Sequence, residues 1–148
     1  MWYVRDKKGF TLIELMISVA IIGILIAAAA ASFVQAQRKA RDGRRMQDME
    51  ALQKAAEQYY LIKNDYLVPI GSGVSWYTNN QSVLENFPKD PKIVGGVGWT
   101  DYSTISSVGT TGYCFCALME NPIGNALTFG CNFQTSGDKY YYCVKNKQ

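Results

Sequence analysis

Histidine is absent from all 148 residues, and this absence narrows the functions open to the chain. Histidine is the commonest general base in enzymes and the commonest metal ligand. Acid–base catalysis and metal binding would therefore have to use other side chains. No nucleophile motif stands elsewhere in the sequence. We therefore expect a chain that is not an enzyme and that needs no metal or cofactor.

Proline is absent from the first 68 residues, and charge is almost absent from residues 10–34. The first proline is Pro69, and residues 10–34 carry one charge, on Glu14, with three further polar side chains: Thr11, Ser18 and Ser32. A helix over these residues would reach roughly 37 Å at about 1.5 Å per residue, whereas the hydrocarbon core of a bilayer is about 30 Å thick. The sequence therefore predicts a transmembrane helix over residues 10–34.

A short basic leader, residues 1–9, precedes this span. Without it 12 basic and 11 acidic residues remain, a balance that argues against nucleic acid as the main partner. The alanines at 27–31 resemble the small residues of a signal-peptide cleavage site, with a cut near Ser32 as the alternative interpretation. The span is, however, longer than the apolar region of a signal peptide.

The helical pattern continues through residues 35–63, because no proline or turn cluster interrupts it. Apolar side chains recur at steps of three and four along its second part, at Met49, Leu52, Ala55, Ala56, Tyr59 and Ile62. This stripe predicts an amphipathic helix that packs against a globular head. Asn64 and then Pro69 predict the end of the helix at about Lys63.

Residues 64–148 predict a head of loops followed by an antiparallel sheet. A short helix is predicted over 82–86, and three or four strands are predicted over 99–107, 113–119, 126–133 and 139–144. Alternation in the second strand assigns Tyr113, Phe115, Ala117 and Met119 to one face and Cys114, Cys116 and Leu118 to the other. The fold class is therefore α+β, with a long N-terminal helix packed on a small antiparallel sheet.

Four cysteines lie in the last 35 residues: Cys114, Cys116, Cys131 and Cys143. An even number beyond a membrane anchor predicts disulfides on the oxidising side. A four-thiolate zinc site is the alternative, although a C-x-C pair lacks the usual C-x2-C spacing. Cys114 and Cys116 lie two apart on one strand face, where a bond between them would distort the backbone. Each should bond Cys131 or Cys143, and two pairings stay open.

The segment Lys-Gly-Phe-Thr-Leu-Ile-Glu-Leu-Met, residues 8–16, resembles the processing site of type IV prepilins and type II secretion pseudopilins. The resemblance implies that a prepilin peptidase cuts after Gly9, that the new terminal Phe10 is methylated, and that Glu14 guides assembly. It further implies a pilin-like fold, copies of the same chain in a helical filament, and an assembly platform in the inner membrane. It covers residues 1–63 well and the head only in outline.

Two other features bear on this resemblance. Many members of the family have a helix-breaking proline near the position of Ala31, where this chain has a run of alanines. Alanine is the best helix former, so the sequence favours an intact helix there, with Gly23 as its weak point. The Lys89-Asp90-Pro91 stretch before the first predicted strand is similar to a feature of the major pseudopilins.

The chemistry of Glu14 supports the same role independently. An ionised carboxylate in a lipid-facing helix costs about 2.5 to 3.5 kcal/mol on insertion, so acids within membranes usually have a partner. After cleavage, the amine of Phe10 would supply one. The alternative is that Glu14 lies near the interface and is solvated or tied to its own helix N-terminus.

Two signals disagree about the orientation of the helix in the membrane. The basic residues of the leader are fewer than those of the neck, which we define as Arg38, Lys39, Arg41, Arg44 and Arg45, so the positive-inside rule favours the wrong end. The cysteines and the processing motif nevertheless predict a cytoplasmic leader and an extracytoplasmic head. The neck is then expected to rest on anionic lipid headgroups, or to pair with acids of neighbouring subunits.

Two further patterns are weak. Scattered carboxylates of the kind that hold calcium in some pseudopilins are present at Asp90, Asp101, Glu120 and Asp138, but such groups usually just solvate a surface. Asn80-Gln81-Ser82 is a formal glycosylation sequon, a tripeptide that is common by chance.

The sequence as a whole predicts a structural subunit that is held in a membrane before assembly and then forms a surface or periplasmic filament. Within the family, a pseudopilin or a DNA-uptake pilus subunit is the alternative. A membrane-anchored binding domain that never polymerises is the alternative from another class. It predicts an uncut chain and a monomer in mild detergent.

Overall fold

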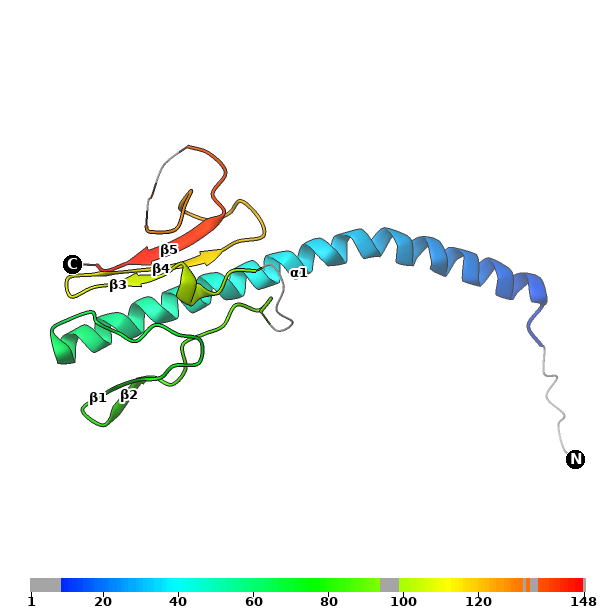
Figure 1. The fold of residues 1–148 in the computed structure, drawn as a ribbon. Coiled ribbons are helices and arrows are strands. Elements are labelled where there is room, and N and C mark those ends of the chain that lie inside the picture. The colour runs from blue at the N-terminus through cyan, green and yellow to red at the C-terminus, as the bar shows by residue number, and fades with distance from the viewer. Residues whose placement is uncertain (1–8, 94–98, 132, 134–135, 148) are drawn as a thin grey trace, which may run out of the picture. The chain divides into compact units, whose positions relative to one another are not determined.

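The computed structural model describes residues 9–93, 99–131, 133 and 136–147, with the backbone alone at Ala31 (Figure 1). The predicted leader therefore lies outside the described residues except for Gly9. The chain divides into two compact units, Met1–Gln37 and Arg38–Gln148, and each is described by itself.

One helix, α1 (Leu12–Lys63), contributes to both units. It starts after Thr11 and is helical through the alanine run and through Gly43, in agreement with the absence of proline. It ends where Asn64 takes a left-handed conformation, with φ 57°, and its N–H donates to the carbonyl of Tyr60 at 2.7 Å. Asparagine tolerates this conformation better than most residues, which explains why the helix stops there.

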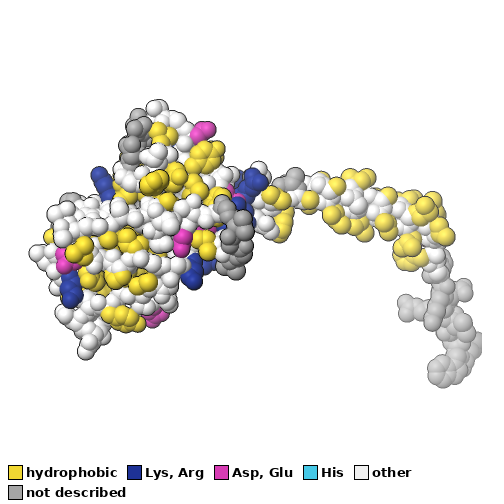
Figure 2. Space-filling view, in the orientation of Figure 1, with side chains coloured by type: hydrophobic (Ala, Val, Ile, Leu, Met, Phe, Trp, Pro, Cys, Tyr) yellow, Lys and Arg dark blue, Asp and Glu magenta, His cyan; other side chains and the backbone are white. Residues whose placement is uncertain are grey.

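The first unit is an apolar helix without a core. Its large hydrophobic side chains, from Phe10 to Val34, are all exposed, and Figure 2 shows them spread over the visible face of this helix. By length and apolar composition, α1 qualifies as a membrane-spanning helix near the N-terminus. A surface of this kind needs lipid or another apolar helix to cover it.

The second unit has its own core, built on one face of α1. Met49, Leu52, Ala55 and Ala56 are buried there against aromatic side chains from the rest of the head: Tyr66, Trp76, Phe87, Tyr102, Tyr113 and Phe115. The predicted stripe is thus confirmed from Met49 to Ala56, and Tyr59 is partly buried against the same core. The extension of the stripe to Ile62 is wrong, because that side chain is 40 % exposed.

A three-stranded antiparallel sheet packs on this core. It consists of β3 (Ser107–Val108), β4 (Tyr113–Leu118) and β5 (Tyr141–Lys145), in that order. Residues alternate along β4 as predicted, since Tyr113, Phe115 and Ala117 join the helix-side core while Cys114 and Cys116 join a second buried cluster. The predicted α+β architecture is confirmed.

A separate hairpin was not predicted. It is formed by β1 (Trp76–Thr78) and β2 (Gln81–Leu84), and in the view of Figure 1 it lies on the opposite side of α1 from the three-stranded sheet. The prediction of a short helix over 82–86 is wrong. Asn79 and Asn80 have φ of 47° and 62°, which is the two-residue turn that closes tight hairpins. This Asn-Asn pair was the signal that the sequence interpretation missed.

Two predicted strands are largely wrong. In the range 99–107 the chain forms a short 3₁₀ helix, η1 (Tyr102–Thr104), because the Thr104 hydroxyl donates to the carbonyl of Asp101 at 2.6 Å and tightens the turn. In the range 126–133, the described residues form no strand and only isolated bridges, at Ala126, which pairs with Tyr141, and at Thr128. Asn132 lies outside the described residues.

Candidate functional site

The N-terminus of α1 carries a reciprocal set of hydrogen bonds between Thr11 and Glu14. The Thr11 N–H and hydroxyl donate to the Glu14 carboxylate at 2.9 and 2.7 Å, and the Glu14 N–H donates to the Thr11 hydroxyl oxygen at 3.3 Å. This is the capping box, in which a Thr at the N-cap and a Glu three residues later satisfy each other's backbone donors. Glu14 therefore has a structural role in the uncleaved chain.

The peptide expected to be cut lies just before this cap. Gly9 and Phe10 have no regular secondary structure, Phe10 is 86 % exposed, and a side chain at Gly9 would meet no other described part of the chain. Both residues are therefore accessible. The nitrogen of Phe10 belongs to a peptide bond in this chain, so its pairing with Glu14 stays a prediction.

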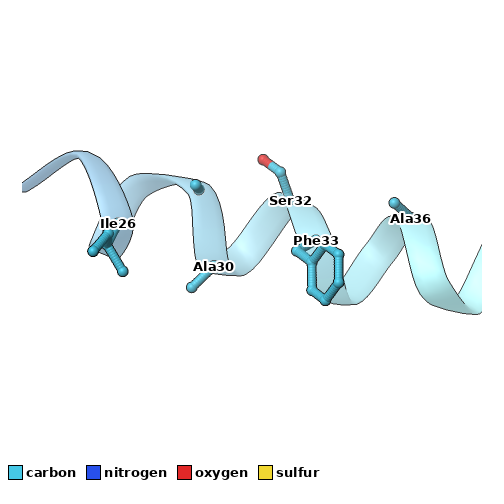
Figure 3. Close-up of a pocket in the computed structure, with 6 residues that line it drawn as sticks. Ile26, Ala30, Ser32, Phe33 and Ala36 are labelled. Atoms are coloured by element: carbon cyan, nitrogen blue, oxygen red, sulfur yellow. The ribbon is translucent and has the colours of Figure 1, made fainter.

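The apolar part of α1 contains a groove of small side chains. Figure 3 shows Ile26, Ala30 and Phe33 on the same side of the helix, and the groove is lined by Ile26, Ala29, Ala30, Ser32, Phe33 and Ala36. Small residues allow the backbones of two helices to approach closely in lipid. The groove belongs to the same exposed surface as the rest of the apolar helix.

At the start of the second unit, α1 carries a buried cluster of charges centred on Arg45. The guanidinium of Arg45 donates to Asp90 through Nε and Nη2, at 2.6 and 3.0 Å, and through Nη1 to Asp42 at 2.8 Å. All three side chains are completely buried. Burial alone would lower the pKa of Arg45, but the hydrogen bonds and charges of its carboxylate partners, Asp90 foremost, outweigh burial and raise the pKa above its usual range.

Glu120 completes this cluster from the turn after β4. Its carboxylate accepts both Nε and Nη2 of Arg41, at 2.5 and 2.9 Å, together with Arg45 Nη1 at 3.1 Å and Lys92 Nζ at 2.9 Å. The hydrogen bond from Arg41 is the main reason that the pKa of Glu120 falls to about 2, against the opposing effect of burial. The charge of Glu120 is therefore held in the ionised form by three cations.

Asp42 ties the same turn to the helix through uncharged groups. It accepts the N–H groups of Glu120 and Asn121 at 2.8 and 3.0 Å, and the Asn121 side-chain amide at 2.7 Å. A carboxylate that accepts several donors compensates its own burial. Helix α1, the 90–92 turn and the 119–121 turn are thus joined by one polar network.

This network corrects the interpretation of the basic neck. Arg45 and Arg41 were expected to face lipid or neighbouring subunits, but both are engaged by carboxylates of their own head. The exposed cations of the neck are the remaining three: Arg38, Lys39 and Arg44. The signal that could have found the cluster was Asp42 three residues before Arg45, a spacing that brings side chains together on a helix.

The carboxylates considered for calcium are not brought together as a set. Asp90 and Glu120 belong to the arginine cluster, whereas Asp101 stands at the N-terminal end of η1, makes no capping hydrogen bond with its side chain and is not part of the cluster. Asp138 is exposed. The only grouping among the described residues with suitable metal ligands is that of the four cysteines.

Those cysteines form two disulfides in the structure, Cys114 to Cys131 and Cys116 to Cys143. This is one of the two pairings left open by the sequence. The four sulfurs lie within 4.8 Å of one another, but a sulfur in a disulfide is not the thiolate that zinc needs. One bond joins β4 to β5, and the other fastens the segment after β4 to the sheet.

Comparison with known proteins finds similarity to part of the chain. Residues 4–30 match the family model described as the prokaryotic N-terminal methylation motif. The chain is 42 % identical over 60 residues to the type IV major pilin protein PilA of Myxococcus xanthus, covering 40 % of this chain and 27 % of that protein. It is 33 % identical over 91 residues to the type IV major pilin protein PilE of Neisseria gonorrhoeae, covering 62 % and 53 %.

A third relative is a fimbrial protein of Pseudomonas aeruginosa, 46 % identical over 57 residues, which cover 38 % of this chain and 37 % of that protein. The matched part spans about a quarter to a half of the length of these relatives. No solved structure matches the chain significantly. The methylation motif and the apolar helix that follows it are thus similar to those of type IV pilins, and the α+β head is consistent with a pilin fold.

Proposed function

We propose that this chain is the precursor of a filament subunit. A prepilin peptidase cuts it after Gly9 and the new N-terminus at Phe10 is methylated. Residues 10–34 then hold the subunit in the membrane until an assembly platform adds it to the filament. Residues 35–63 continue this helix into the head, which residues 64–148 complete. The relatives that match parts of this chain are named type IV major pilin proteins, and this supports a structural role over an enzymatic one.

The observation that carries the proposal is the contrast between the two units. The first is an apolar helix whose large side chains are exposed along its whole length, and the second has its own hydrophobic core. In the described part of the chain, these large apolar side chains stay exposed. Lipid can cover them before assembly and copies of the same helix can cover them afterwards.

Glu14 is proposed to exchange its structural partner for a neighbour during assembly. In the uncleaved chain its carboxylate is satisfied by Thr11. Among helices bundled away from water, the same carboxylate can pair with the new amine of an incoming Phe10, and an axial slip would leave a charge buried alone. Glu14 would thus set the register of the filament.

Two substitutions separate this role from capping. Glu14→Gln keeps an oxygen that accepts from Thr11 but removes the charge, whereas Glu14→Ala removes both. We expect both variants to be inserted and cut yet to form few filaments in electron micrographs, with Ser18→Ala, another polar residue of the span, assembling normally. Normal filaments from Glu14→Gln would show that capping, not charge, is what assembly needs.

The alternative of an anchored domain that never polymerises predicts a different result. Native protein would then begin at Met1, and purification in mild detergent would give a monomer under all conditions. Surface filaments that contain this chain would exclude that alternative. Filaments seen only when the chain is overproduced, and confined to the periplasm, would favour a pseudopilin.

A further inference from the structure

The head has a cationic and aromatic pocket beside the buried charge cluster. It is lined by Arg38, Lys92, Trp99, Met119, Glu120 and Tyr140. All of these residues belong to the second unit, so the pocket is part of the head itself. From this pocket we infer a binding site for the headgroup of an anionic phospholipid.

The pocket offers hydrogen-bond donors of the kind that a phosphodiester accepts. Arg38 is exposed and forms no ion pair within the described chain. Lys92 Nζ lies 4.1 Å from the centre of the Trp99 ring, on which Arg45 also stacks at 4.7 Å. The indole Nε1 of Trp99 is buried and has no hydrogen-bond partner among the described residues. A phosphate oxygen could accept from both the guanidinium and the indole.

Glu120 does not make the pocket repulsive to an anion. Its two oxygens already accept hydrogen bonds from Arg41, Arg45 and Lys92, while the other two acids of the cluster, Asp42 and Asp90, are completely buried. Within this cluster three cations balance three anions. Arg38 therefore adds a net positive charge at the mouth of the pocket.

The position along the chain selects a lipid as the source of the phosphate. Arg38 follows Val34, the last residue of the apolar span, by four residues, which is about 6 Å of helix. The headgroup region on each side of a bilayer is of about that thickness. Tryptophan and tyrosine, here Trp99 and Tyr140, are the side chains that favour this level. The inference rests on the membrane-anchored state within the proposed function.

The test measures lipid retention by inserted, full-length protein that has not polymerised, so it is independent of filament assembly. The protein is reconstituted in nanodiscs of mixed phosphatidylglycerol and phosphatidylcholine, extracted in mild detergent, and the retained lipids are quantified by mass spectrometry. We expect enrichment of phosphatidylglycerol over the bulk composition. No enrichment in the wild-type protein would overturn the inference while leaving the proposed function intact.

The matched control is Arg44, an exposed arginine of the same helix that does not line the pocket. We expect Arg38→Gln to lower the enrichment at least about fivefold and Arg44→Gln to lower it less than about twofold, since a diffuse surface charge would make the two losses equal. Equal losses of enrichment in the two variants would overturn the assignment of lipid binding to this pocket. Trp99→Phe, which keeps the ring but removes the indole N–H, should also lower the enrichment without changing the unfolding midpoint.

Inorganic phosphate distinguishes the two sources of the anion. We expect phosphate at millimolar concentration to leave the retained phosphatidylglycerol unchanged, because the lipid is held at the surface by its chains. Complete displacement by phosphate would show a site for free anions and would overturn the assignment to lipid.

Discussion

The guanidinium of Arg45 donates two hydrogen bonds to the carboxylate of Asp90, from Nε to Oδ2 at 2.6 Å and from Nη2 to Oδ1 at 3.0 Å. The two residues are 45 positions apart and both side chains are completely buried. Such a bidentate pair fixes orientation as well as distance. It fastens the start of the head's helix to the 90–92 turn.

Replacing Arg45 should therefore destabilise the head severely. Arg45→Ala leaves Asp90 and Asp42 buried without their cation, and breaking a buried pair in this way typically costs about 3 to 5 kcal/mol. The free energy of unfolding of the full chain in detergent, measured with urea and tryptophan fluorescence, would test this. Arg44→Ala is the control, because an exposed side chain should change stability by about 0.5 kcal/mol or less. Equal stability of the two variants would contradict the role of the cluster.

The pH dependence of stability should show the contribution of Glu120. Its pKa in the native state is about 2, mainly because Arg41 is hydrogen-bonded to it, and the value in an unfolded chain is about 4.3. Since the native pKa is the lower one, the stabilisation is fully present above the unfolded value and is lost as the pH falls from about 4.5 toward 2. Glu120→Gln should be less stable at pH 7 and lose less between those pH values. A slope unchanged from wild type would count against this assignment, and exposed Glu85→Gln serves as the control.

The disulfides should be Cys114 to Cys131 and Cys116 to Cys143, as in the structure. Peptide mapping of native protein under non-reducing conditions can read the pairing directly. The bonds close segments with sequence separations of 17 and 27 residues, and loops of this size give about 3 kcal/mol each in the chain-entropy model. Four free thiols, or Cys114 bonded to Cys143, would contradict this pairing.

Processing should yield a mature chain that begins with N-methylated Phe10. Intact mass and N-terminal sequencing of native protein measure this, and a start at Met1 or Ser32 would refute it. Gly9→Leu should leave the chain uncut. Because a side chain at Gly9 meets no other described part of the molecule, the unfolding midpoint of the head should not change.

Much of the fold was predictable because its signals are local. The apolar span 10–34 could be predicted from composition alone, and the end of α1 could be predicted from Asn64 and Pro69. The two faces of β4 could be predicted from strict alternation. The hairpin also had a local signal, the Asn79-Asn80 pair at its turn. It was missed because residues 82–86 were interpreted as a helix. Strand propensity failed at 99–107, because Tyr102 instead anchors a turn by donating to Asp48 at 3.0 Å.

The sequence by itself determined the apolar helix, the methylation motif around Gly9 and Phe10 and the amphipathic face from Met49 to Tyr59, since each depends on residues within a few turns of one another. Only the tertiary structure decided what the charges of the neck do. Whether Arg45 faces lipid or is buried depends on Asp90 and Glu120, which lie 45 and 75 positions away. No periodicity reports such a pairing, because the energy of a buried charge is set by the groups that folding brings around it.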